Sequence, residues 1–265
     1  MEVKGSKIKT IIIIILCMII VGLLGFILYE KKVDNQTTTS PVEKEKTTVK
    51  EVDIKSDIVT NAMNSFAHLS LLDEDIYKTG EFDISNMTKE QLVATASNAV
   101  YDLGKEYIKE CDNSSKGKVV SINTLNSLLE KYVLDKKITL EDVKNVKTGG
   151  YTVENDGILI EGACGDEISF EDYSEKNIVK AETEEDYLYI YEKIAFAKYN
   201  DINADQPTIN YYKDYARNNL MEKNKSSLQI TETKDLPNWD LYNTYKYTFK
   251  KVNNNYYFQN IKFYE

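Results

Sequence analysis

The sequence predicts an α+β protein: an N-terminal transmembrane helix, then further helices, followed by a mainly antiparallel β-sheet. Three observations predict this class. An uninterrupted apolar run lies near the start, and apolar residues then recur at helical spacing as far as residue 147. From Gly150 onward, alternating strand patterns are separated by short polar turns. Helices first and strands afterwards is the order expected for α+β folds.

The apolar run covers residues 10–29 and contains no charged side chain. As a helix it would be about 30 Å long, which matches the hydrocarbon core of a bilayer. A secretory signal has a shorter apolar core, and a cleavage site made of small residues follows it. This sequence lacks such a site, so we expect residues 10–29 to remain as a membrane anchor. Three lysines within residues 1–9 favour a cytoplasmic tail, with the C-terminal domain extracellular.

Residues 30–52 are rich in Thr, Lys and Glu and hold few large apolar side chains. Such a segment cannot bury a core, so we expect a flexible linker. The extracytoplasmic domain should then span residues 53–265. We expect it to be mainly helical over 53–147 and mainly β over 150–265.

The first expected helix carries its apolar stripe on Ile58, Ala62, Phe66 and Leu69. A second helix should start at Thr88, because Gln91 stands three residues later in the pattern of a capping box. Its apolar positions continue to Leu103, and the pattern allows it to reach Ile108. A short strand over 118–122 and a third helix follow. The apolar face of that third helix consists of Leu125, Leu128, Leu129 and Val133.

The β half should contain hairpins with tight polar turns. Residues 151–162 alternate around Asn155-Asp156-Gly157, where we expect positive φ angles. A second hairpin turns at 182–185, and a third turns at 252–255. Residues 208–220 fit a strand better than a helix. The result is a sheet of five to seven strands.

The charge balance argues against nucleic-acid binding. Residues 1–52 hold eight lysines and six acidic residues, which leaves 25 basic and 37 acidic residues in 53–265. A domain with this acidic excess lacks the clustered basic surface that nucleic acids require.

The three cysteines are Cys17, Cys111 and Cys164. Cys17 lies in the expected anchor, so the domain keeps two. Cys111 and Cys164 can pair in an oxidising space, or they can remain as two buried thiols; the sequence leaves both alternatives open.

No motif predicts a catalytic centre, a cofactor or a metal site. His68 is the single histidine, and it shares a polar helix face with Asp57, Asn61 and Asn64, which indicates a solvent-exposed side chain. The segment 201–205 begins like a calcium loop but lacks the glycine and the glutamate that such a loop requires.

Tyrosine is unusually abundant, and 15 of the 20 tyrosines follow Gly150. Exposed rows of them could stack on sugar rings or pack a partner peptide, although tyrosine is also common in ordinary strands. The candidate binding residues are Tyr187, Tyr189 and Tyr191 on one strand face, with a matching stripe at Tyr245 and Tyr247.

The C-terminal stretch YKYTFKKVNNNYYFQNIKFYE resembles the ending of uncharacterised single-pass membrane-anchored extracytoplasmic proteins of low-GC Gram-positive bacteria. The anchor, the linker and the order of helices before strands are similar over the whole chain. This resemblance implies a place in the cell envelope and no established activity.

Three functions remain open. The first is a non-enzymatic module that binds an envelope protein, favoured by the anchor and by the lack of catalytic signatures. The second is a cell-wall glycan-binding domain that uses the tyrosine-rich sheet face. The third is an envelope hydrolase with acidic catalytic residues.

Overall fold

The computed structural model describes residues 48–111, 115–146, 150–162, 172–200, 208–226 and 237–265. The expected tail at 1–9 and the expected anchor at 10–29 lie outside these ranges. Within them, no helix is both long enough and apolar enough to cross a membrane. Thr48–Glu265 forms one compact unit. It is α+β with a mainly antiparallel sheet, which confirms this part of the predicted fold class, whereas the N-terminal transmembrane helix stays a prediction.

The larger sheet has eight described strands, one more than the upper limit of the expected five to seven. Six run in the order β1-β7-β8-β11-β12-β2, β9 pairs with the far end of β8, and β10 pairs with β9. Every pairing in it is antiparallel. The strands are β1 (Lys50–Glu51), β2 (Glu81–Asp83), β7 (Asp172–Glu184), β8 (Tyr187–Asn200), β9 (Thr208–Tyr212), β10 (Leu220–Ser226), β11 (Asn243–Val252) and β12 (Asn255–Phe263).

Strand β1 comes from the end of the expected linker. Lys50 and Glu51 pair with β7, and the Val52 N–H donates to the carbonyl oxygen of Ala181 at 2.9 Å. The linker predicted for residues 30–52 was therefore too long, because the strand already begins at Lys50. Its polar composition concealed the strand because an edge strand needs backbone hydrogen bonds and few apolar side chains.

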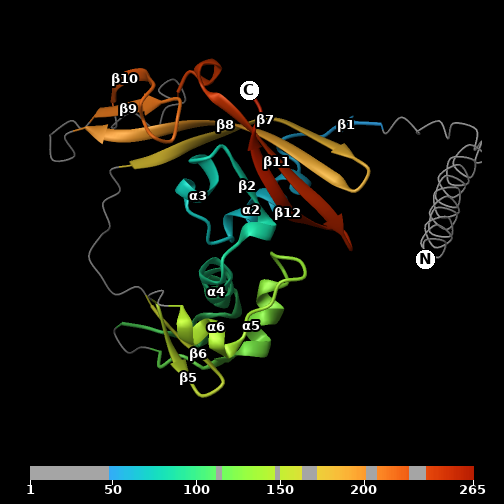
Figure 1. Cartoon of the computed structure of the whole chain (residues 1–265), viewed down its shortest axis with the longest axis vertical. Helices are drawn as coiled ribbons and strands as arrows, with labels where there is room; N and C mark the ends of the chain where they lie inside the picture. Colours follow the sequence, from blue (N-terminus) through green and yellow to red (C-terminus); the bar gives the residue numbers. More distant parts are fainter. Residues whose placement is uncertain (1–47, 112–114, 147–149, 163–171, 201–207, 227–236) are drawn as a thin grey trace, which may run out of the picture. The chain divides into compact units, whose positions relative to one another are not determined.

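The helices lie on one side of this sheet, with a second, four-stranded sheet beyond them (Figure 1). The helix α2 packs against β12, and α4 contacts both α5 and α6. The α-helices are α2 (Asp57–Ala67), α3 (Asp73–Tyr77), α4 (Lys89–Asn98), α5 (Ile122–Leu129) and α6 (Leu140–Asn145). The small sheet consists of β3 (Ile108–Lys109), β4 (Val120–Ser121), β5 (Tyr151–Glu154) and β6 (Gly157–Glu161).

Two expectations about the helices were wrong in detail. Ile58, expected on the buried stripe of α2, is 44 % exposed, and its neighbour Val59 is buried instead. The helix that begins with the Thr88 capping box ends as α4 at Asn98 and continues as 3-10 turns to Leu103. Gly104 then adopts a φ of 116°, which no helix allows, and Ile108 lies in β3.

The first and third hairpin turns form where the sequence placed them. The second forms at residues 185–186 rather than at 182–185, because Glu182, Thr183 and Glu184 pair with β8 as part of β7. One glycine also has a different role from the expected one. Asn155 has a φ of 52°, Glu185 has a φ of 51°, and Asn254 has a φ of 69°. Gly157, expected to supply a positive φ, is instead the first residue of β6. A Cβ atom there would lie 2.2 Å from the carbonyl oxygen of Val120. Gly157 is therefore required by the close approach of β4 and β6 rather than by the turn.

One hydrophobic cluster joins the inner face of the large sheet to the helices and to the small sheet. A second, smaller cluster lies on the outer face and contains Ala195, Ala197, Ile209, Tyr211 and Tyr242. The inner face of the large sheet is therefore closed to ligands, and part of its outer face is also covered.

Candidate functional site

The tyrosines predicted as a binding surface lie on two opposite faces of the large sheet. Strand β11 pairs with β8 so that Tyr247 lies opposite Ile190 and Tyr245 lies opposite Glu192. Residues opposite each other point to the same face of a sheet. Tyr245 and Tyr247 therefore share the core face, whereas Tyr187 and Tyr189 point outward.

Tyr245 and Tyr247 consequently belong to the core, and the prediction that they extend the stripe of Tyr187, Tyr189 and Tyr191 was wrong. Tyr247 is 0 % exposed and Tyr245 is 3 % exposed. The register decides this assignment, because a shift of one residue would place both rings on the other face. Neither ring can contact a ligand on the surface.

Tyr247 takes part in a buried polar chain under the sheet. Its hydroxyl donates to the Oε2 atom of Glu192 at 2.6 Å and lies 2.9 Å from the hydroxyl of Tyr77. Glu192 is only 4 % exposed. Burial raises the pKa of the Glu192 carboxyl, and the hydrogen bond from Tyr247 offsets part of that rise. Burial also raises the pKa of Tyr247 and of Tyr77.

Charged side chains from the adjacent strands β7 and β11 contact the outer tyrosines. The Nζ atom of Lys246 lies 3.6 Å from the ring centroid of Tyr189, and that of Lys180 lies 4.9 Å from the centroid of Tyr191. The Tyr191 hydroxyl donates to Glu182 at 2.5 Å. These cation–π contacts and hydrogen bonds cover ring faces that a ligand would otherwise use.

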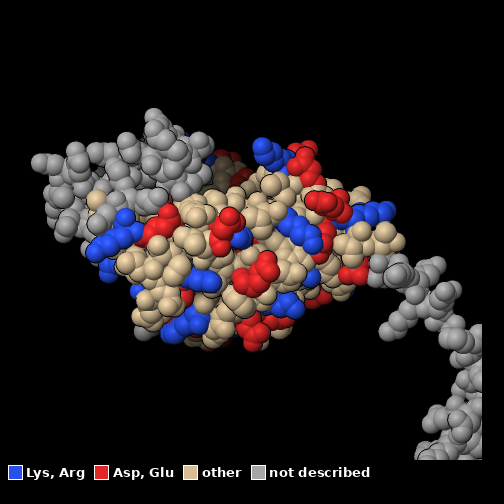
Figure 2. All heavy atoms as spheres, turned by 90° about the horizontal axis from the view of Figure 1, so that it is seen from above, with Lys and Arg blue, Asp and Glu red and all other residues tan. Residues whose placement is uncertain are grey.

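The charges on this outer face balance one another. Burial alone would raise the pKa of Glu182, but hydrogen bonds from Lys180 and Tyr191 lower it overall. Burial lowers the pKa of Lys246, and the negative charge of Glu182 opposes that shift. Figure 2 shows acidic and basic side chains interspersed over this side of the molecule. The surface resembles a solvated sheet face more than a binding platform.

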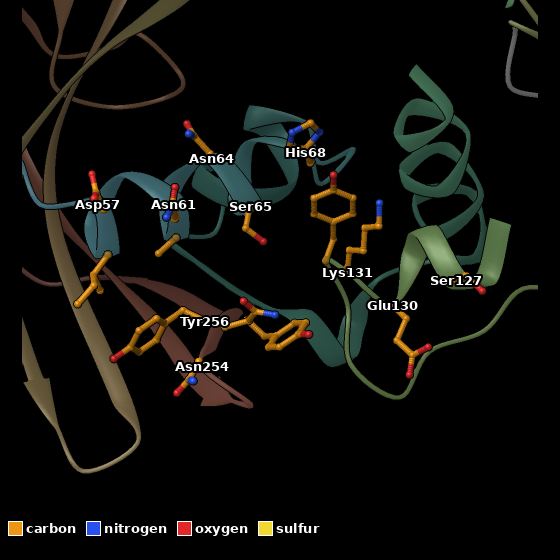
Figure 3. A pocket seen from close by; sticks show the side chains of 15 residues that line it. Asp57, Asn61, Asn64, Ser65, His68, Ser127, Glu130, Lys131, Asn254 and Tyr256 are labelled. Atoms are coloured by element: carbon orange, nitrogen blue, oxygen red, sulfur yellow. The ribbon is translucent and has the colours of Figure 1, made fainter. Parts of the chain in front are cut away.

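A groove of about 700 Å³ lies on the helical side, where the sequence predicted no site (Figure 3). Its walls come from three parts of the chain. One is the polar face of α2, the second is the end of α5 with the turn after it, and the third is the β11–β12 turn with the start of β12. The lining side chains include Asp57, Asn61, Asn64, Ser65 and His68 from α2, Ser127, Glu130, Lys131 and Tyr132, and Asn254, Asn255, Tyr256 and Tyr257.

His68 lies where α2 ends, and its ring stacks on Tyr132 with the centroids 4.7 Å apart. The Tyr132 hydroxyl donates to the Oδ2 atom of Asp102 at 2.5 Å. Burial, followed by this bond, raises the pKa of Tyr132 to about 12. His68 is exposed, as the sequence predicted, but it forms part of a groove wall.

Four asparagines line the groove, and all four are exposed: Asn61, Asn64, Asn254 and Asn255. Among the described residues their side-chain amides have no hydrogen-bond partner, so their donors and acceptors remain available to a ligand. The sequence had placed Asn61 and Asn64 on one polar face with Asp57 and His68. It could not indicate that residues 127–132 and 254–257 lie across from that face.

The remaining predicted features lie mostly elsewhere. Cys111 is disulfide-bonded, whereas Cys164 lies outside the described residues, so the pairing of Cys111 with Cys164 stays a prediction. The polar loop 201–205 also lies outside them. In the part of the chain that the structure describes, no cluster of His, Cys, Asp and Glu is arranged to hold a metal ion.

Comparisons of the chain with protein-family models, with curated proteins and with solved structures found no match.

Proposed function

We propose that the chain is a membrane-tethered, extracytoplasmic binding module of the cell envelope, and that the groove is its ligand site. The observation that carries this proposal is the groove itself. Its volume of about 700 Å³ lies within the range of ligand pockets, and unpaired amide groups line it from two separate elements.

We propose binding rather than acid–base catalysis for the groove, because its one histidine, His68, stacks on Tyr132 and no hydrogen bond among the described residues joins the His68 ring to a carboxylate or a nucleophile. A general acid or base works best with a pKa near the operating pH. In the groove wall, burial raises the pKa of Tyr132 to about 12, which keeps its hydroxyl protonated at neutral pH. The buried carboxyl of Glu192, whose pKa is also raised, does not line the groove.

The expected anchor at residues 10–29 and the linker that follows support the location. Fully extended, residues 30–47 would reach at most about 65 Å from the membrane surface. The candidate partners that the domain can reach within that distance are the membrane itself, an envelope protein and a cell-wall polymer.

A photoreactive amino acid tests the groove in living cells. It replaces Asn64 in the full-length chain, and a matched chain carries it at Lys250, an exposed position on β11 outside the groove. We expect irradiation to attach an envelope component through position 64 and not through position 250. Equal capture at both positions, or none at position 64, would contradict the proposal.

A further inference from the structure

We infer that the ligand of the groove is a neutral glycan, a short stretch of uncharged cell-wall polysaccharide. This inference rests on the proposed function, and it names the ligand class. It also moves the expected glycan site from the tyrosine-rich sheet face to the helical side of the domain.

The asparagine side chains match the hydrogen-bonding pattern of sugar hydroxyls. Each amide offers two N–H donors and a carbonyl oxygen that accepts. Each sugar hydroxyl both donates and accepts, so an amide can bind a neighbouring pair of hydroxyls. Asn61 and Asn64 are one helical turn apart on α2, whereas Asn254 lies in the β11–β12 turn and Asn255 begins β12. Amides from both elements can therefore bind different parts of one oligosaccharide.

The groove also has aromatic rings among these amides. The exposed ring of His68 stacks on the buried ring of Tyr132, with planes that differ by 28°, and the half-buried Tyr256 lines the groove from β12. His68 and Tyr256 are therefore the rings that a ligand can reach. The electron-rich face of an aromatic ring attracts the partly positive C–H groups on the flat side of a sugar ring. Rings beside amides therefore suit a ligand with alternating apolar faces and hydroxyl edges.

The charges of the groove disfavour an anionic polymer. Its wall contains two carboxylates, Asp57 and Glu130, and one ammonium group, Lys131. The rest of the domain adds to this negative balance. Polyphosphates and uronic acids require clustered basic side chains, and repulsion by this domain would weaken their binding.

An extended peptide fits less well for a different reason. Peptide recognition depends on a few large side chains buried in apolar pockets. Ile58 is the one exposed large aliphatic side chain among the described groove residues, and polar neighbours flank it on α2. The lining of the groove is about equally polar and apolar, so a peptide would find hydrogen-bonding groups but only one exposed aliphatic side chain as an anchor.

The test is a calorimetric titration of the full-length chain in lipid nanodiscs. The neutral probe is a tetramer of β-1,4-linked N-acetylglucosamine, and the anionic probe is poly(glycerol phosphate). A groove variant combines Asn61→Ala, Asn64→Ala and Asn255→Ala. The control is Asn123→Ala, an exposed asparagine of α5 that does not line the groove.

We expect the neutral tetramer to bind and the anionic polymer not to bind. Each lost hydrogen bond should weaken binding about fivefold, so the groove variant should bind roughly 100-fold more weakly than the unchanged chain. The control should bind like the unchanged chain. Alanine favours helix, so the α2 substitutions should leave the thermal unfolding midpoint unchanged or slightly higher.

Three outcomes would overturn the inference: no binding of the tetramer, preferential binding of poly(glycerol phosphate), or equal binding by the groove variant. A failure of this inference differs from a failure of the proposed function. If position 64 captures a protein or an anionic polymer in cells, the groove is a ligand site but the glycan assignment is wrong. If position 64 captures nothing, the binding module itself is contradicted.

Discussion

Replacing Tyr247 by phenylalanine would remove one hydroxyl from the buried chain under the sheet. In the folded protein that hydroxyl donates to Glu192 and lies 2.9 Å from the hydroxyl of Tyr77. The substitution keeps the ring and its packing, including the edge contact with Phe66. Its effect on stability therefore measures the polar chain alone, and ligand binding in the groove should be unchanged.

The expected cost follows from the partners that are left behind. A typical internal hydrogen bond contributes about 1 kcal/mol, and leaving a buried polar group unsatisfied costs about 1–3 kcal/mol. Glu192 is 4 % exposed and would lose its tyrosine donor, so we expect the free energy of unfolding to fall by about 2–4 kcal/mol. For a domain of this size, each kcal/mol lowers the unfolding midpoint by about 2–4 °C.

Denaturant unfolding at neutral pH would measure this loss, with Tyr77→Phe as the matched control. That control leaves the bond between Tyr247 and Glu192 in place, so we expect a loss of about 1 kcal/mol. Combining Tyr247→Phe with Glu192→Leu should restore part of the stability, because the unpaired carboxyl is then gone. If Tyr247→Phe unfolds like the unchanged chain, or the double variant is less stable than the single one, the buried chain does not act as described.

Three further predictions concern other parts of the chain. Because burial raises the folded-state pKa of Glu192, its contribution to stability is fully present below the unfolded pKa of about 4.3 and is lost as pH rises through the folded pKa. The difference in the free energy of unfolding between the unchanged chain and Glu192→Leu should therefore change with pH in this direction, and a difference that does not change with pH would contradict the buried, proton-holding carboxyl. Gly157→Ala should lower the free energy of unfolding by about 1–3 kcal/mol, because the new Cβ atom would collide with a carbonyl oxygen of β4. Calorimetric unfolding would measure this loss, and a smaller loss would contradict the close approach of β4 and β6. Combining Tyr187→Ser and Tyr189→Ser should leave glycan binding unchanged in the nanodisc titration. If binding is lost while the unfolding midpoint stays unchanged, the glycan site lies on the outer sheet face instead of in the groove.

Features that depend on neighbouring residues were predicted well. The Thr88 capping box forms as expected, with the Thr88 hydroxyl accepting from the Gln91 N–H and the Gln91 side chain accepting from the Thr88 N–H. The turns at Asn155 and Asn254 also form where the sequence placed them. Their signals depend on the intrinsic preferences of a few consecutive residues, so a single sequence is enough to find them.

Features that depend on pairing between distant segments were missed. The alternation in β8 and β11 showed that each strand has two faces, but only their register shows that Tyr247 shares a face with Ile190. The groove depends on segments that lie even farther apart in the sequence, because its walls combine α2 with residues 127–132 and with residues 254–257. The pattern of α2 identified a polar face but contained no information on what lies opposite it.

The central claim is that the asparagine-lined groove binds the ligand of this domain. The most direct measurement follows the side-chain amide NMR signals of the full-length chain in nanodiscs while neutral wall glycan fragments are added. We predict that the signals of Asn61, Asn64, Asn254 and Asn255 shift with increasing glycan, and that the signal of Asn123 stays in place. Unchanged groove signals in the presence of bound glycan would contradict the claim.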